Sequence, residues 1–262
     1  MLSQSSIRAA ADLLWKHWRE SLRIRELPGE VRPADRTEGY AIQTMLAELS
    51  NQRIEGWKIA ATSRAGQAHI EVDGPLAGCL LKDKILKNGA IISLTGNLMR
   101  VAEAEFAFRM GRDLRKRTLP YSMDEVLDAV ETLHPAIEVP DSRYEDFTKV
   151  GAPQLIADNA CACWFILGAP VEVNWRDIDL AKHPVNGYKN DHATSAGSGA
   201  NVLGDPRTAL TWIANELIQF GDGLLAGQVV TTGTCITPIA VNPGDHVRMD
   251  FGIMGSVEAR FS

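Results

Sequence analysis

The sequence predicts an α+β protein in which a helical N-terminal part packs on a mostly β core. Three observations support this class. The first fifty residues carry apolar side chains at helical spacing, the sequence after Gly56 changes to short apolar runs separated by Gly, Pro and Asn, and only two further helical segments interrupt those runs. A chain of 262 residues with 45% hydrophobic residues can bury a sizeable core. We expect a helical part at residues 1–55 and a β-rich domain at residues 56–262.

Two amphipathic helices are expected near the N-terminus. Ser5 and Ser6 are expected to cap the first helix, and Arg36 opens the second after a proline-containing loop at residues 27–33. The apolar positions that define the two faces are Ile7, Ala10, Ala11, Leu14 and Trp18 in the first helix and Tyr40, Ile42, Leu46 and Leu49 in the second.

The remainder of the chain favours strands. A capping box, Ser122 with Glu125, predicts one helix over residues 122–132, and apolar residues at helical spacing predict another over residues 206–220. The short apolar runs that we expect to form strands are residues 57–61, 78–81, 90–94, 103–108, 136–139, 162–167, 228–232 and 246–251.

Composition argues against several classes of partner. The net charge of −6 and a pI near 5.6 leave no basic face for nucleic acid. No apolar run reaches the roughly 18 residues of a membrane span, and the N-terminus does not read as a signal peptide, so we expect a cytoplasmic protein. Four cysteines without a CxxC pair indicate reduced, buried thiols.

Glu103 and Glu105 are the strongest chemical signal in the chain. They alternate with apolar residues on a predicted strand, so both carboxylates point to the same face. Two adjacent charges in an apolar strand repel each other unless a cation neutralises them, and oxygen ligands without His or Cys favour Mg²⁺ or Mn²⁺. The alternative is a polar stripe that faces solvent.

Lys58 is the candidate for proton chemistry. It lies between Trp57 and Ile59 in a predicted strand, where burial would lower its pKa, while nearby carboxylates would raise it. Sequence leaves open which effect dominates, and a salt-bridged structural lysine is the alternative.

Several motifs together resemble those of the 2-oxopent-4-enoate hydratases and 4-oxalocrotonate decarboxylases of the fumarylacetoacetate hydrolase superfamily. The resemblance extends over nearly the whole chain. The motifs that carry it are Gly56-Trp-Lys-Ile59, Thr62-Ser63, and residues 102–108, 135–138, 157–160, 227–233, 242–245 and 252–256.

The resemblance implies a mixed β-roll core and an Mg²⁺ or Mn²⁺ site. It identifies Glu103, Glu105 and Glu138 as the metal ligands and places Lys58 at the active site. It also implies a homo-oligomer, and a small 2-oxo or 2-hydroxydienoic acid as substrate, derived from the catabolism of aromatic or related compounds.

Further residues are expected near the substrate. The resemblance implicates two segments, whose members are Thr62, Ser63, Thr232, Gly233 and Thr234. His134 is a possible acid or base, with a hydrogen-bonded structural histidine as the alternative.

One position departs from the family pattern. Many of the hydratases carry an acid where this chain has Leu76, and leucine transfers no proton. Either Asp73 or Glu71 compensates, or the reaction differs from the usual hydration.

The leading functional hypothesis is a lyase that hydrates a 2-oxo-enoic acid, formed from a 2-hydroxydienoate, to a 4-hydroxy-2-oxo acid. Decarboxylation of a 2-oxo-enedioate is the runner-up, because it needs no attacking water. A non-catalytic binding or assembly partner is a third hypothesis, and it predicts a degraded carboxylate set.

Overall fold

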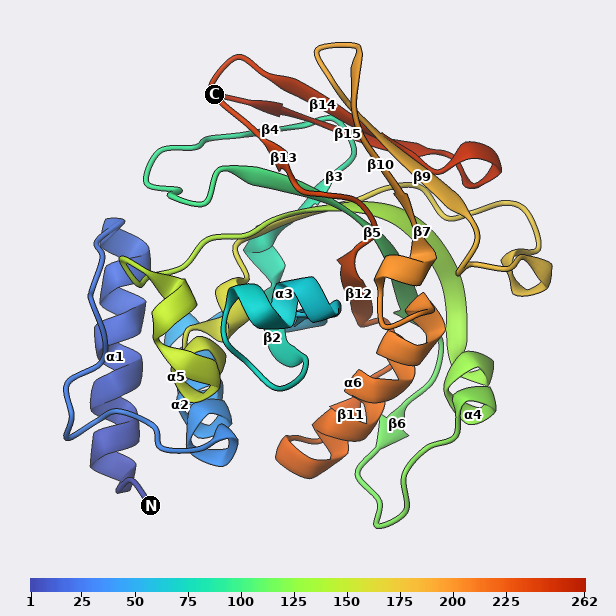
Figure 1. Cartoon of the computed structure of the whole chain (residues 1–262). Helices are drawn as coiled ribbons and strands as arrows, with labels where there is room; N and C mark the ends of the chain where they lie inside the picture. Colours follow the sequence, from blue (N-terminus) through green and yellow to red (C-terminus); the bar gives the residue numbers. More distant parts are fainter.

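The computed structural model describes residues 1–262. The chain forms two β-sheets with helices around them (Figure 1). Helices α1, α2 and α5 gather on one side of the molecule, and the C-terminal strands form a separate layer (Figure 1). The helices are α1 (Gln4–Glu20), α2 (Arg36–Ser50), α3 (Arg64–His69), α4 (Met123–Asp128), α5 (Gly151–Ala157) and α6 (Pro206–Phe220). None of them combines the length and apolarity needed to cross a bilayer.

The main sheet has eight strands, and seven of them follow the order β2-β1-β12-β5-β7-β8-β3, with β13 also paired to β5. These strands are β1 (Ile54–Ala60), β2 (Leu76–Leu81), β3 (Ile85–Lys87), β5 (Val101–Met110), β7 (Val130–Val139), β8 (Trp164–Leu167), β12 (Val229–Thr234) and β13 (Ile239–Ala240). Parallel pairs, β1 with β12 and β3 with β8, occur among antiparallel ones, so the sheet is mixed. The predicted α+β class with a mixed β core is confirmed.

A second sheet has five strands in the order β10-β9-β14-β15-β4. They are β4 (Ala90–Ile92), β9 (Pro184–Lys189), β10 (His192–Ser198), β14 (His246–Asp250) and β15 (Ser256–Phe261), and a small ribbon joins β6 (Leu114–Arg115) to β11 (Gly223–Leu224). Met249 and Val257 of this layer belong to the same large hydrophobic core as Ile137 of β7. The second sheet therefore packs on one face of the main sheet.

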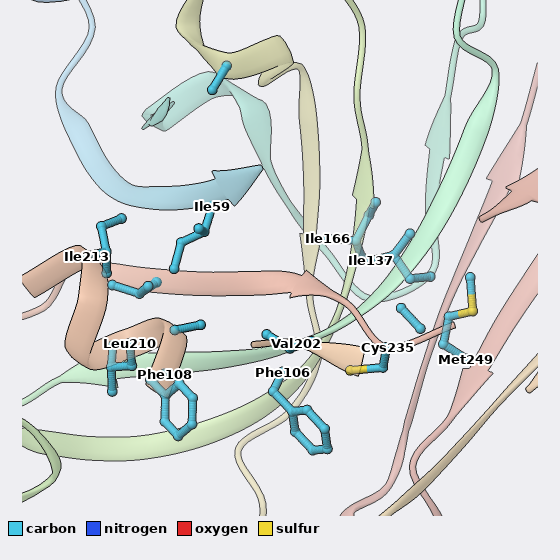
Figure 2. Packing of buried hydrophobic residues seen from close by; sticks show 14 of the residues in the cluster. Ile59, Phe106, Phe108, Ile137, Ile166, Val202, Leu210, Ile213, Cys235 and Met249 are labelled. Carbon is cyan, nitrogen blue, oxygen red and sulfur yellow. The ribbon is translucent and has the colours of Figure 1, made fainter. Parts of the chain in front are cut away.

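The main sheet rolls up, so that one of its faces becomes an interior. Leu80 of β2 and Phe165 of β8 lie near opposite ends of the strand order, yet they belong to one small buried cluster with Ala107, Ala136 and Val229. Alternate residues on the same strands point the other way and pack under α6. Figure 2 shows Leu210 and Ile213 of α6 beside Ile59 and Phe108.

Helices α1 and α2 form as expected, except that the first helix begins earlier. Its cap is Ser3, whose hydroxyl accepts from the Ser6 N–H, and not Ser5 or Ser6. The two helices share a small hydrophobic core that also contains Tyr144 and Ala157 from later in the chain. The division at residue 55 stays a prediction.

The helix predicted over residues 122–132 is too long. The capping box between Ser122 and Glu125 forms, but the helix ends at Asp128, and β7 begins at Val130. Val130 pairs with Met110 of β5, and this ladder continues to Glu138. The capping box therefore marks only the start of this helix, and pairing with β5 decides where it ends.

Candidate active site

Strand register brings three carboxylates together on the interior face of the rolled sheet. Glu103 on β5 lies directly opposite Glu138 on β7, and Glu105 follows two residues further along the same face of β5. One oxygen from each of these three side chains lies within 4.8 Å of the others. Glu105 and Glu138 are buried, whereas Glu103 is partly exposed.

The cluster contains more hydrogen-bond acceptors than donors. Glu105 Oε1 and Glu138 Oε2 are buried without a hydrogen-bond partner in the protein, and the Lys58 ammonium is the one group that neutralises Glu138 Oε1. Buried anionic oxygens left in this state are costly, and a hard divalent cation is the group that satisfies several of them at once. The three side chains therefore fit an Mg²⁺ or Mn²⁺ ion.

Strand β12 fixes the orientation of Glu105. The Thr231 hydroxyl and the Gly233 N–H, the latter at 2.7 Å, both donate to Glu105 Oε2, which leaves Oε1 facing the cluster. Gly233 has φ +105°, and a Cβ there would lie 2.0 Å from Thr62 Oγ1. A glycine is needed at this position, because any side chain would displace Thr62 and the N–H that holds Glu105.

Lys58 reaches the cluster from three strands away. Strands β1 and β7 are separated by β12 and β5, a distance of about 14 Å in a flat sheet, so only the roll lets the two side chains meet. Lys58 Nζ lies 2.9 Å from Glu138 Oε1 and donates to the Ala160 carbonyl at 3.0 Å. The lysine is 3% exposed.

The carboxylates decide the protonation of Lys58. Burial lowers the pKa of Lys58, but the charges of Glu138 and Glu103 raise it, and the net pKa lies above the ordinary lysine value. The amine is therefore a protonated ammonium in the metal-free protein, which answers the question that the sequence left open.

The same crowding raises the carboxyl pKa values. Burial, followed by the charge of Glu138, raises the pKa of Glu103 to about 7, against the lowering effect of Lys58. Burial, with the charges of Glu138 and Glu103, raises the pKa of Glu105 well above its usual range. Without a cation, the site accordingly retains protons near neutral pH.

Divalent-cation affinity should therefore depend on pH. Because the Glu103 pKa is raised, a proton occupies this carboxyl below about pH 7 and must leave when the cation binds. We expect the association constant for Mg²⁺, measured by isothermal titration calorimetry, to fall steadily from pH 7.5 to pH 5.5. Proton release on binding, read from buffers of different ionisation enthalpy, should increase over the same range. A flat profile would contradict the raised carboxyl pKa values.

The expected substrate residues lie near the cluster, but most of their hydroxyls have partners within the protein. The Thr232 hydroxyl donates to Phe106 O, and the Thr234 hydroxyl donates to Ile236 O. Ser63 caps α3 by accepting from the Gly66 N–H. Thr62 is buried against Gly233, next to the Glu105 support. Substrate contacts by these residues stay predictions.

Neither of the two possible acid or base residues belongs to the carboxylate cluster, and their roles stay predictions. His134 lies four residues before Glu138 on β7, and its ring nitrogens bond to Thr132 Oγ1 and Gly168 O. Asp73 is exposed on the loop before β2. Leu76 is fully buried, and it pairs with Ala60 on the same face of the sheet as Lys58.

One supporting feature was not expected from the sequence. Residues Asn159–Cys161 form a left-handed turn on the interior face, and Ala160 in this turn supplies the carbonyl that binds Lys58. The adjacent Asp158-Asn159 pair was the only available signal, because asparagine tolerates left-handed backbone and bonds to neighbouring main chain.

A rolled sheet with three clustered carboxylates beside a buried lysine is the architecture of an enzyme that binds a hard divalent cation. The comparisons with known proteins give the same class. A family model described as fumarylacetoacetate (FAA) hydrolase C-terminal matches residues 66–262. The chain belongs to this family.

Relatives over the full length include both hydratases and decarboxylases. The chain is 34% identical to 2-keto-4-pentenoate hydratase 1 from Dechloromonas aromatica, with 98% of this chain and 97% of the relative covered. It is 32% identical to a 4-oxalocrotonate decarboxylase from Pseudomonas putida, with 86% and 84% covered. A solved 4-oxalocrotonate decarboxylase from Pseudomonas putida G7, complexed with magnesium and adipate, superposes with a TM-score of 0.90 at 27% identity, covering 100% and 99% of the two chains.

Proposed function

We propose that this enzyme is a hydro-lyase that adds water to a small 2-oxo-enoic acid, formed by tautomerisation of a 2-hydroxydienoate, and gives a 4-hydroxy-2-oxo acid. The observation that carries the proposal is the convergence of Glu103, Glu105 and Glu138 with the Lys58 ammonium in one buried cluster. The full-length similarity to a 2-keto-4-pentenoate hydratase supports it.

In this proposal the carboxylates bind the cation and Lys58 handles protons. A cation held by Glu103, Glu105 and Glu138 would supply a Lewis acid for the carboxylate and 2-oxo oxygens of the substrate. The Lys58 ammonium donates one N–H to Ala160 O and pairs with Glu138 Oε1, so its third N–H is the one that can deliver a proton to the carbon chain as the dienol becomes the 2-oxo-enoate.

Orientation and exclusion of water are tasks for the surrounding residues. Thr231 and Gly233 keep Glu105 aimed at the cluster, and Glu103 is the one of the three glutamates that is partly exposed. In such a low-dielectric setting, charges act more strongly on a developing enolate than they would in water. Water addition at C4, with a proton to C3, completes a hydration that balances without any redox partner.

Decarboxylation of a 2-oxo-enedioate is the second candidate, and Leu76 favours it. This side chain is buried on the Lys58 face, where it offers no group to activate water. Loss of CO₂ requires stabilisation of an enolate but no attacking water, so the same cluster would serve it. The similarity to a 4-oxalocrotonate decarboxylase supports this candidate. A non-catalytic assembly role is disfavoured, because the carboxylate cluster and lysine are complete.

The two candidates separate in one assay. Metal-loaded protein is incubated with freshly generated 2-hydroxypenta-2,4-dienoate or with 2-oxo-3-hexenedioate, and products are identified by mass. Gain of one water on the first substrate supports the hydratase, and loss of CO₂ from the second supports the decarboxylase. If neither is consumed while metal is bound, both assignments are wrong. Homo-oligomeric assembly and a cytoplasmic location stay predictions.

A further inference from the structure

We propose that the left-handed turn at Asn159–Cys161 is a positioning device for Lys58, with Asn159 and Gly78 as its positioning residues. The inference rests on the proposed function in that Lys58 is taken to be the proton-handling group. It adds an account of what holds that ammonium in its place beside Glu138 and keeps it from moving further in among the carboxylates.

The turn has an unusual backbone. Asn159, Ala160 and Cys161 have φ values of 56°, 48° and 62°, all in the left-handed region and none on a glycine. Each such residue is strained, because its Cβ crowds the backbone in this region, and successive ones are rare outside glycine-rich turns. A conformation of this kind persists only where the surroundings hold it.

One anchor is strand β2. The Asn159 side chain accepts from the Cys79 N–H at 2.7 Å and donates to the Cys79 carbonyl at 2.9 Å, so it binds this strand as a neighbouring strand would. Gly78 lets the turn approach closely, because a Cβ there would lie 2.3 Å from Asn159 O. Gly78 is also the residue that pairs with Lys58 in the sheet.

The other anchor is a buried ion pair on the far side of the turn. The guanidinium of Arg143 binds the Asp158 carboxylate and main-chain oxygen before the turn, and it donates to Ala162 O at 3.3 Å after it. The Trp18 ring of α1 covers this guanidinium, with Arg143 Cζ 4.2 Å from the ring centroid. The turn is thus fixed at both of its ends.

This geometry directs one hydrogen-bond acceptor, the Ala160 carbonyl, at Lys58. With the turn seated over Gly78, the Ala160 carbonyl lies 3.0 Å from Lys58 Nζ. The ammonium already lies 2.9 Å from Glu138 Oε1, and the charges of Glu103 and Glu105 also attract it, so without the carbonyl it would move further in among the carboxylates. There it would compete with a divalent cation for the same oxygens. The turn therefore serves cation binding and proton delivery together.

A double-mutant cycle on cation binding tests this inference without any substrate. Gly78→Ala forces the turn away from β2, and we expect the Kd for Mn²⁺, measured by calorimetry, to rise at least threefold. In a Lys58→Met background the same Gly78→Ala change should leave the Kd unaltered, because the competing ammonium is gone. Gly74→Ala is the matched control, since a Cβ at Gly74 meets nothing within 4 Å.

Two results would overturn the inference. An unchanged Kd in Gly78→Ala would show that the turn does not restrain Lys58, and an equal rise in both backgrounds would show that it acts on the carboxylates. If Gly78→Ala does not fold, Asn159→Gly keeps the left-handed backbone accessible while removing the bonds to Cys79, and it enters the same cycle. Inactivity of the unmodified enzyme on both proposed substrates would count against the function alone.

Discussion

Replacement of Glu105 by glutamine should weaken Mg²⁺ binding by about 100-fold or more and abolish turnover, yet leave the fold intact. Glutamine preserves the shape, and its oxygen still accepts from Thr231 and Gly233. The unpartnered Oε1 becomes an amide NH₂ group, which cannot bind a cation. Calorimetric titration with Mg²⁺ measures the first effect, and product formation measures the second.

The stability of the metal-free Glu105→Gln protein provides an internal check. Burial and the neighbouring carboxylates disfavour the charged form of Glu105, so removing the charge should not lower the melting temperature of the metal-free protein. Added Mg²⁺ should raise the melting temperature of the unmodified protein only. Full activity in this variant would refute Glu105 as a ligand, and a fall of many degrees without metal would assign it a structural role.

Lys58→Met should separate catalysis from cation binding. Methionine fills similar space without the ammonium, and the loss of a positioned proton donor typically lowers kcat by about 10² to 10⁴-fold. Cation affinity should increase, since the positive charge 2.9 Å from Glu138 Oε1 is gone. Steady-state kinetics and Mn²⁺ calorimetry on one preparation measure both effects.

Lys87→Met is the matched control for this change. Lys87 is an exposed lysine on β3 of the same sheet, and its replacement should alter neither kcat nor the Kd. A Lys58→Met enzyme with more than half of the original kcat would remove Lys58 from the mechanism. A large loss of cation affinity would instead make Lys58 a structural support for Glu138.

The sequence correctly predicted those features of the fold that depend only on residues close together in the chain. Alternation along β5 put Glu103 and Glu105 on one face, and the capping box at Ser122 marked the start of α4. The end of α4 was misjudged because β7 is specified by pairing with β5, which a local pattern does not contain. The strand His192–Ser198 was missed for a related reason, because its small residues are held by pairing with β9.

The site was predictable in its residues and not in its geometry. Glu138 faces Glu103 because of the register between β5 and β7, and Lys58 reaches Glu138 because the sheet rolls up. Both are tertiary properties. The turn beneath Lys58 was not predicted, because three left-handed residues without glycine leave only the Asp158-Asn159 pair as a local signal. His134 looked eligible by residue type, and in the structure its ring nitrogens bond to Thr132 Oγ1 and Gly168 O.

The central claim is that Glu103, Glu105 and Glu138 together bind a divalent cation beside Lys58. A crystal structure of the Mn²⁺-soaked protein, with anomalous difference density collected near the manganese edge, tests it most directly. The account predicts one strong peak about 2.1 to 2.2 Å from an oxygen of each of the three carboxylates, with Lys58 Nζ still bonded to Ala160 O. A fully loaded crystal whose peak lies elsewhere, or whose ion is bound without one of these glutamates, would contradict it.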